Sequence, residues 1–150
     1  GYCIKYADHL LGESARLVHA NSYYECEFDV DVFGSATMVN RQEVIVQMSF
    51  GMDNDYKCEL EAWGSTGTLT TGRILTAPDG LKPEMIIKHN QKYATAILPA
   101  DNAFEKSIRR FYECLADEEA RKENYRVIER QSTFVDDFKR LSASNQSDLY

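Results

Sequence analysis

The stretch EVIVQMSFGMDNDYKCELEAWGSTGTL, residues 43–69, decides the expected fold. Hydrophobic side chains alternate with polar ones over residues 43–52 and again over residues 57–63, which is the two-residue period of a strand with one buried face. MDNDY separates the two runs as a turn, and GSTGT leads into Leu69 as a hairpin turn. Because connections this short cannot hold a crossover helix, the strands are expected to pair antiparallel.

The same strand signals continue on both sides of this stretch. Residues 29–39 alternate, and Gly34 inside that run predicts a bend or bulge. Residues 70–83 are weakly patterned and are expected to form a loop, with a turn at Pro78-Asp79-Gly80. The further expected strands are residues 16–27, 29–39, 84–88 and 93–97.

Helical periodicity appears at the two ends of the chain. Ile4, Ala7 and Leu11 form one stripe of a short helix over residues 4–11, and Gly12 stands where such a helix ends. After Pro99 the period becomes helical again, and Asp101 or Asn102 can cap a helix with apolar positions Ile108, Phe111, Tyr112 and Leu115. A second helix is expected after the acidic residues 117–119. Within it, Glu, Lys and Arg of residues 121–130 are interpreted as a solvated face with ion pairs.

This order of elements predicts a soluble α+β domain over residues 1–142. A polar tail over residues 143–150 follows, and the chain is expected to be frayed from Ser142 onward. The domain is expected to hold an open, predominantly antiparallel sheet of six or seven strands, with helices packed on one face. The chain begins without Met, directly in a helix that carries functional groups. We therefore expect it to be part of a longer protein.

Composition excludes several classes of partner and ligand. The formal net charge is −7, and the basic residues are scattered, which disfavours nucleic acid. The sequence has neither a stretch long enough for a membrane span nor a signal peptide. The four cysteines, Cys3, Cys26, Cys58 and Cys114, form no CxxC pair, and His19 and His89 have no second ligand at metal spacing. We expect reduced cysteines, a cytoplasmic protein and no metal site.

The side chains that carry chemistry lie in the first helix. Tyr2, Lys5, Tyr6 and His9 follow the spacing i, i+3, i+4 and i+7, which places them on one face. Together they can donate protons and bind hydroxyl or phosphate oxygens. The alternative is an ordinary solvated face of an amphipathic helix. The sequence contains neither a Gly-rich dinucleotide motif nor a P-loop, so no cofactor is expected to be bound by this chain alone.

Three groups of motifs carry a resemblance to a known family. GYCIKYADHLLG resembles the segment that opens the second domain in the glucose–fructose oxidoreductase, inositol dehydrogenase and NDP-sugar ketoreductase family. VIVQMSFGM and LEAWGSTGTLTTGR are similar to its sheet strands, and FEKSIRRFYECLADEEARKENYRVIERQSTFVDDFKRL to its closing helices. The resemblance implies a Rossmann domain that precedes this one, a substrate between the two domains, and a sheet that mediates homo-oligomerisation.

The resemblance also implies roles for individual residues. Tyr2 matches the family's acid/base, which works beside a Lys of the absent domain, and Lys5 is a local candidate for the cation that helps a tyrosine act. Lys5 stands where relatives often have Asp or Asn, and Asp8 where they often have Arg. The resemblance predicts substrate contacts from Lys5, Tyr6 and His9, and more weakly from Arg73 and Asn102, for which surface charge and helix capping are the simpler interpretations.

Two functions follow as hypotheses. The first is the substrate-binding and oligomerisation domain of an oxidoreductase that acts on a sugar, sugar nucleotide or cyclitol, with NAD or NADP bound mainly by the missing domain and with no activity of this domain alone. The second is a non-catalytic dimerisation or interaction module that uses an exposed apolar sheet face. That face would be built from Val30, Val32, Val46, Met48, Phe50 and Trp63, and Trp63 is otherwise expected in the core or a subunit interface.

Overall fold

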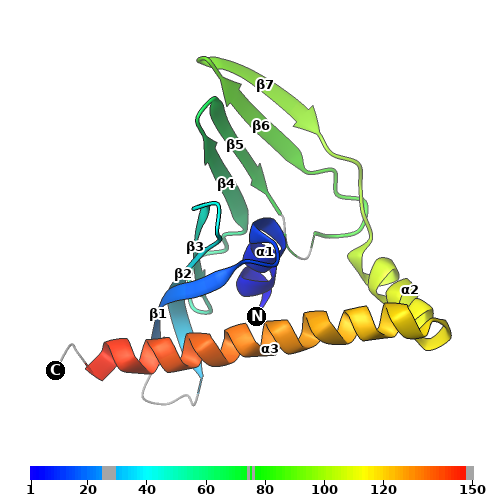
Figure 1. Ribbon diagram of the computed structural model, residues 1–150. Helices are drawn as coiled ribbons and strands as arrows, with labels where there is room; N and C mark the ends of the chain where they lie inside the picture. Colours follow the sequence, from blue (N-terminus) through cyan, green and yellow to red (C-terminus); the bar gives the residue numbers. More distant parts are fainter. Residues whose placement is uncertain (25–29, 74, 76, 148–150) are drawn as a thin grey trace. The chain divides into compact units, whose positions relative to one another are not determined.

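A computed structural model describes residues 1–24, 30–73, 75 and 77–147 of the chain (Figure 1). Its helices and strands are α1 (Tyr2–Leu11), β1 (Arg16–Tyr24), β2 (Asp31–Val39), β3 (Ile45–Gly51), β4 (Glu59–Gly64), β5 (Gly67–Gly72), β6 (Glu84–His89), β7 (Lys92–Ile97), α2 (Ala103–Ala116) and α3 (Glu118–Ser147). The predicted α+β class is confirmed. The ends of the first two predicted strands, at residues 25–27 and 29, lie outside the described residues, as does Cys26.

All seven strands of the described residues pair antiparallel, as predicted, but they are distributed over two sheets. One sheet has the order β1-β2-β3 and the other β4-β5-β6-β7. The contacts divide the chain into two compact units, Gly1–Asn54 with Lys122–Tyr150, and Asp55–Arg121. Each unit is described by itself.

In the first unit, α1 and α3 cover one face of the β1–β3 sheet. The alternation predicted for this region is confirmed, because Val46, Met48 and Phe50 of β3 face the helices while Ile45, Gln47 and Ser49 are exposed. The three apolar residues of β3 therefore belong to a covered face and not to the exposed face that the second hypothesis requires. Burial of these side chains is the main favourable term in holding the unit together. The core consists of Ile4, Ala7, Leu11, Ala15, Ala20, Ala36, Met38, Phe134 and Phe138.

Gly34 has a different role from the predicted bend. It lies in regular register within β2, opposite Ser22 and Phe50. A Cβ added there would lie 2.7 Å from the carbonyl oxygen of Asn21 and 2.9 Å from the Phe50 ring. The glycine is needed because a backbone oxygen and an aromatic ring approach it closely, while the irregularities lie elsewhere, at Leu17/His19 and Tyr23/Tyr24.

The frayed tail predicted from Ser142 is wrong for its first residues. Helix α3 continues to Ser147. Ser142 is only 3% exposed, and its hydroxyl lies 2.7 Å from that of Ser22 in β1. A buried hydroxyl pair satisfies both polar groups and so extends the packed part of the helix.

In the second unit, the GSTGT segment forms the predicted hairpin turn, with Gly64 opposite Gly67 at its end. Strand β5 then continues to Gly72, three residues into the predicted loop. Asn102 caps α2, because its side-chain oxygen accepts a hydrogen bond from the Glu105 amide at 3.0 Å. None of the described helices is long and apolar enough to cross a membrane.

Candidate functional site

A hollow of about 330 Å³ runs along the solvent-facing side of α1. Residues Tyr2, Lys5, Tyr6, Asp8 and His9 line it, together with Val127 of α3. The predicted stripe explains why these side chains face outward. Ile4, Ala7 and Leu11 are buried against the sheet, which leaves the opposite face of the helix to the hollow.

The four side chains predicted as a site all line this hollow. Tyr2 is 69% exposed, Lys5 and His9 are exposed, and Tyr6 is half-buried. Within the described part of the chain, none of these four side chains takes part in a hydrogen bond or an ion pair. Two phenols, an ammonium and an imidazole are therefore free to bind the oxygens of a ligand and to exchange protons with it.

Asp8, where the family often has Arg, lies at the edge of the same hollow but is already paired. Its carboxylate accepts hydrogen bonds from Arg130 of α3, with the Nε donor at 2.8 Å. Arg130 is thus not part of a solvated face, contrary to the sequence interpretation of residues 121–130. That interpretation does hold for Arg126, which pairs at 2.8 Å with Glu123 on the surface of the same helix.

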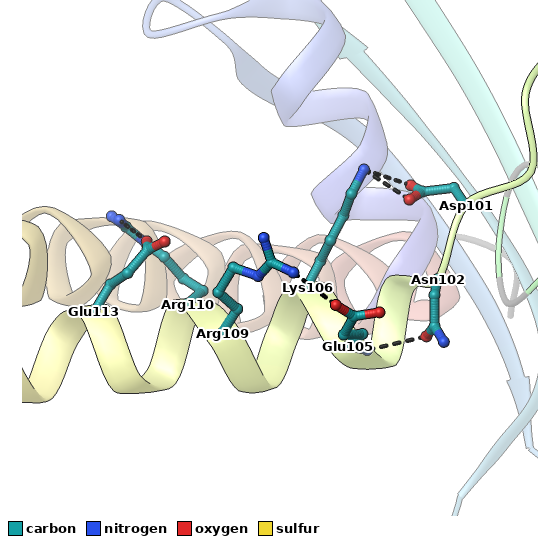
Figure 2. A pocket seen from close by; sticks show the side chains of 7 residues that line it. All are labelled: Asp101, Asn102, Glu105, Lys106, Arg109, Arg110 and Glu113. Atoms are coloured by element: carbon teal, nitrogen blue, oxygen red, sulfur yellow. Dashed lines mark hydrogen bonds and ion pairs between the residues drawn. The ribbon is translucent and has the colours of Figure 1, made fainter.

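The two weaker candidates lie in the other unit. Asn102 lines a second hollow, along the polar side of α2, and its side chain is engaged as the helix cap (Figure 2). Arg73 has a left-handed backbone, with φ 53°. Its guanidinium donates to the Tyr56 hydroxyl at 2.8 Å and lies 4.4 Å from the centre of that ring. Both side chains therefore have local partners.

The α2 hollow is lined by charges that neutralise one another. Lys106 pairs with Asp101, Arg109 with Glu105 and Arg110 with Glu113 (Figure 2). The hydrogen bond from Lys106 lowers the pKa of Asp101 below its ordinary value, and the hydrogen bond to Glu113 raises the pKa of Arg110. Such exposed pairs contribute little to stability, and the hollow has no uncompensated charge to attract a ligand.

The described residues contain neither a group of metal ligands nor a parallel βαβ unit. No group of three His, Cys, Asp or Glu side chains within residues 1–24, 30–73, 75 and 77–147 is placed to hold a metal ion. Cys3, Cys58 and Cys114 are free thiols. Every described strand pairs antiparallel, so this part of the chain lacks the parallel βαβ unit with which dinucleotides are usually bound.

Local sequence reasoning missed two residues of the α1 hollow. The resemblance marks Asp8 only as a departure from the family, and the helical pattern of α1 does not include Val127 of α3. Val127 does share a helical stripe with Arg130, Gln131 and Phe134, at i, i+3, i+4 and i+7. That spacing was the available signal that this face of α3 points inward.

Comparisons with known proteins agree with the motifs. No protein-family model matches the chain. It is 35% identical over 135 residues to the dTDP-3,4-didehydro-2,6-dideoxy-alpha-D-glucose 3-reductase of Actinomadura kijaniata, and 30% identical over 115 residues to the enzyme of the same name from Streptomyces violaceoruber. These matches cover 90% and 76% of this chain, but only 41% and 34% of the two relatives.

Solved structures give the same result. The chain matches a variant of KijD10, a 3-ketoreductase from Actinomadura kijaniata in complex with TDP-benzene and NADP, with a TM-score of 0.83 at 35% identity. This match covers 90% of the chain and 43% of that structure. A second KijD10 variant gives a TM-score of 0.85 at 34% identity over 92% of the chain and 44% of that structure. The chain is therefore homologous to the C-terminal part of the KijD10-type dTDP-sugar 3-ketoreductases, which confirms the resemblance to the glucose–fructose oxidoreductase, inositol dehydrogenase and NDP-sugar ketoreductase family.

Proposed function

We propose that this chain is the substrate-side part of an NADP-dependent reductase that acts on a keto sugar linked to a nucleotide. The observation that carries the proposal is the α1 hollow, where four side chains able to bind oxygens or exchange protons have no hydrogen bond within the described chain. The relatives are reductases of a dTDP-linked keto sugar, and their solved structures hold NADP and a TDP derivative. Lys5 offers the hollow a cation for such an anionic ligand.

In this proposal Tyr2 is the general acid. Its phenol gives a proton to the carbonyl oxygen of the substrate while the carbonyl carbon accepts a hydride, so that a ketone becomes a carbinol. Lys5, one turn further along α1, stabilises the phenolate that remains. The solved KijD10 structures include one variant in which a tyrosine was replaced by phenylalanine, which supports a tyrosine as a residue to test.

The hydride donor lies outside the part that this chain supplies. The antiparallel sheets described above do not fit a dinucleotide, so in the proposal the nicotinamide is bound elsewhere in the intact protein and supplies only the hydride. The chain's own contribution is to bind the sugar nucleotide, to orient its carbonyl and to deliver the proton.

The test compares the intact protein that carries this chain with residues 1–150 alone. NADPH oxidation is followed at several concentrations of the dTDP-linked keto sugar that the relatives reduce. We expect turnover by the intact protein and none by residues 1–150, which remain folded by circular dichroism. Absence of turnover and of ligand binding in the intact protein would contradict the proposed function, and turnover by residues 1–150 alone would contradict the division of roles.

A second function, homo-oligomerisation, is favoured by one face of the β4–β7 sheet. The strand register places Trp63, Ile86, Tyr93 and Ile97 on the same face, and all four are exposed, with Trp63 at 81%. Charged side chains such as Glu61 and Lys88 lie between them on the same face. Large exposed apolar side chains in such a mixed surface are typical of a surface that binds another subunit, and a two-fold pair of such faces is self-complementary. We propose that a second copy of the chain covers it.

Sedimentation of the intact protein tests this proposal. We expect Trp63→Arg to shift a dimer or larger assembly towards monomer, because a charge would be buried against a neighbouring sheet. Phe104→Arg, at a similarly exposed aromatic position on α2, is the matched control and should leave the assembly unchanged. A wild-type monomer, or equal effects of both substitutions, would count against the sheet as the interface.

A further inference from the structure

Arg130 is bound to the end of α1 by every nitrogen of its guanidinium. Nε and Nη2 contact the Asp8 carboxylate at 2.8 and 2.7 Å. Nη2 also donates to the carbonyl oxygen of Gly12 at 2.9 Å, and Nη1 to that of Glu13 at 2.9 Å. The guanidinium carbon Cζ lies 5.1 Å from the centre of the buried Phe134 ring. Two of these acceptors are the carbonyls just beyond the helix, a region that favours a cation.

The neighbouring residue of α3 holds the opposite end of α1. The side-chain amide of Gln131 donates to the carbonyl oxygen of Gly1 at 3.0 Å. The same oxygen accepts the first hydrogen bond of the helix, from the Lys5 amide at 3.1 Å. Gly1 directly precedes Tyr2, so one turn of α3 holds α1 both beside the proposed acid and beyond His9.

The same face of α3 also forms a wall of the hollow. Val127, one turn before Arg130, lines it together with the side chains of α1. Asp8, which Arg130 binds, lines it too and is only 17% exposed. A fixed geometry between α1 and α3 therefore determines the shape of the hollow as well as the direction in which its functional groups point.

We propose that Arg130 is a positioning residue for the proton-donating face of α1, acting through Asp8 and the carbonyl oxygens of Gly12 and Glu13. The inference rests on the proposed function of the α1 hollow. Its physical basis is geometric. A planar guanidinium binds several acceptors at fixed angles, which a flexible ammonium cannot reproduce. A small rotation of a ten-residue helix displaces the phenol at its far end, and displacements of about 1 Å are known to cost about 100-fold in rate.

The first measurement needs no activity. Hydrogen–deuterium exchange of α1 is compared in the intact wild-type protein, Arg130→Gln and Arg130→Lys. We expect faster exchange in the last turn of α1 for Arg130→Gln, an intermediate rate for Arg130→Lys, and unchanged rates in β2 and β3. Arg126→Gln is the matched control, because Arg126 lies one turn away and, among the described residues, pairs only with Glu123 of its own helix. Unchanged α1 exchange in Arg130→Gln would overturn the proposal.

The second measurement separates positioning from stability. We expect Arg130→Gln to lower kcat by about 10- to 100-fold with a much smaller change in KM, Arg130→Lys to recover part of that loss, and Arg126→Gln to match the wild type. Asp8→Asn, which keeps the carbonyl contacts of Arg130, should lower kcat less than Arg130→Gln. Normal kcat of folded Arg130→Gln would overturn the positioning role. If the wild-type protein turns nothing over, the proposed function fails and the exchange data still decide whether Arg130 orders α1.

Discussion

Helices α1 and α2 both line a hollow with their polar faces, but their side chains are engaged differently. On α2 the charged residues of the hollow pair with one another, as Lys106 does with Asp101. On α1 the side chains of Tyr2, Lys5, Tyr6 and His9 have no such partner within the described residues. Polar groups that already pair with one another bind a ligand weakly. The unpaired donors of α1, a helix that Arg130 and Gln131 hold in place, can bind one.

The apolar faces of the two helices show the opposite difference. The apolar stripe of α1 is buried, while that of α2, with Phe104, Ile108, Phe111 and Leu115, is exposed. The position of α1 is therefore fixed by packing, by Arg130 and by Gln131. A catalytic group needs such a rigid support, so the difference favours α1 as the functional helix.

The largest effect is expected at the proposed acid. Tyr2→Phe removes one hydroxyl and should lower kcat of the intact protein by about 10²- to 10⁴-fold, the usual contribution of a general acid. The melting temperature should stay nearly the same, because the side chain is exposed. Tyr112→Phe on α2 is the matched control and should match the wild type. Equal kcat values for the two variants would remove the functional difference between the helices.

The next effect concerns packing. Leu11→Ala should lower the free energy of unfolding by about 2–5 kcal/mol, since Leu11 is buried against the sheet. Leu115→Ala on α2 should change it by less than about 0.5 kcal/mol, because that side chain is exposed. Denaturant unfolding of the intact protein measures both. A cost above about 1 kcal/mol for Leu115→Ala would reveal that another part of the protein covers the apolar side of α2.

A smaller effect is expected at the two lysines. Lys5→Met removes the unpaired ammonium of the α1 hollow and should raise KM for an anionic sugar nucleotide by about tenfold, with the difference shrinking as salt increases. Lys106→Met removes an ammonium already neutralised by Asp101 and should leave KM unchanged. Steady-state kinetics at two ionic strengths decide this. The reverse order of effects would place the ligand at α2.

The smallest effect is a pH dependence at α2. The hydrogen bond from Lys106 lowers the pKa of Asp101, so the folded chain holds that proton less tightly than the unfolded one. The pair therefore contributes its small stabilisation at neutral pH and loses it as the pH falls through the lowered pKa. Carboxyl NMR shifts of Asp101 should titrate below its ordinary range in the wild type and move back towards it in Lys106→Met. No difference between the two titrations would show that the pair does not form.

Much of the fold could be predicted because it depends on local patterns. The spacing of Ile4, Ala7 and Leu11 predicts the buried side of α1, and the GSTGT segment predicts the β4–β5 hairpin. A helix cap at Asp101 or Asn102 follows from residue type, and in the structure Asn102 is the cap. The partition into two sheets and the role of Gly34 depend on which strands and rings approach one another, and a local pattern does not contain that information.

The candidate site was predictable to the same extent. Helical spacing alone places Tyr2, Lys5, Tyr6 and His9 on one face, and they do line one hollow. Their roles remain predictions. The support of α1 was not predictable locally, because Asp8 and Arg130 are 122 positions apart in the sequence. Residues 121–130 have the composition of a solvated helix. The spacing of Arg130 and Phe134 indicates an inward-facing side, but only tertiary contacts identify Asp8 as the partner of Arg130.

The discontinuity of the first unit has a consequence for synthesis on the ribosome. Residues 55–121 form a compact unit of their own. The unit with the α1 hollow combines residues 1–54, which precede that segment, with residues 122–150, which follow it. Phe134 and Phe138 complete the core over α1 and the β1–β3 sheet, so that core cannot close until α3 has left the exit tunnel. During elongation the continuous segment can therefore fold first, while the sheet face that α3 later covers is left open to chaperones or to wrong partners. Of the two units described here, the one with the α1 hollow is the last to be assembled.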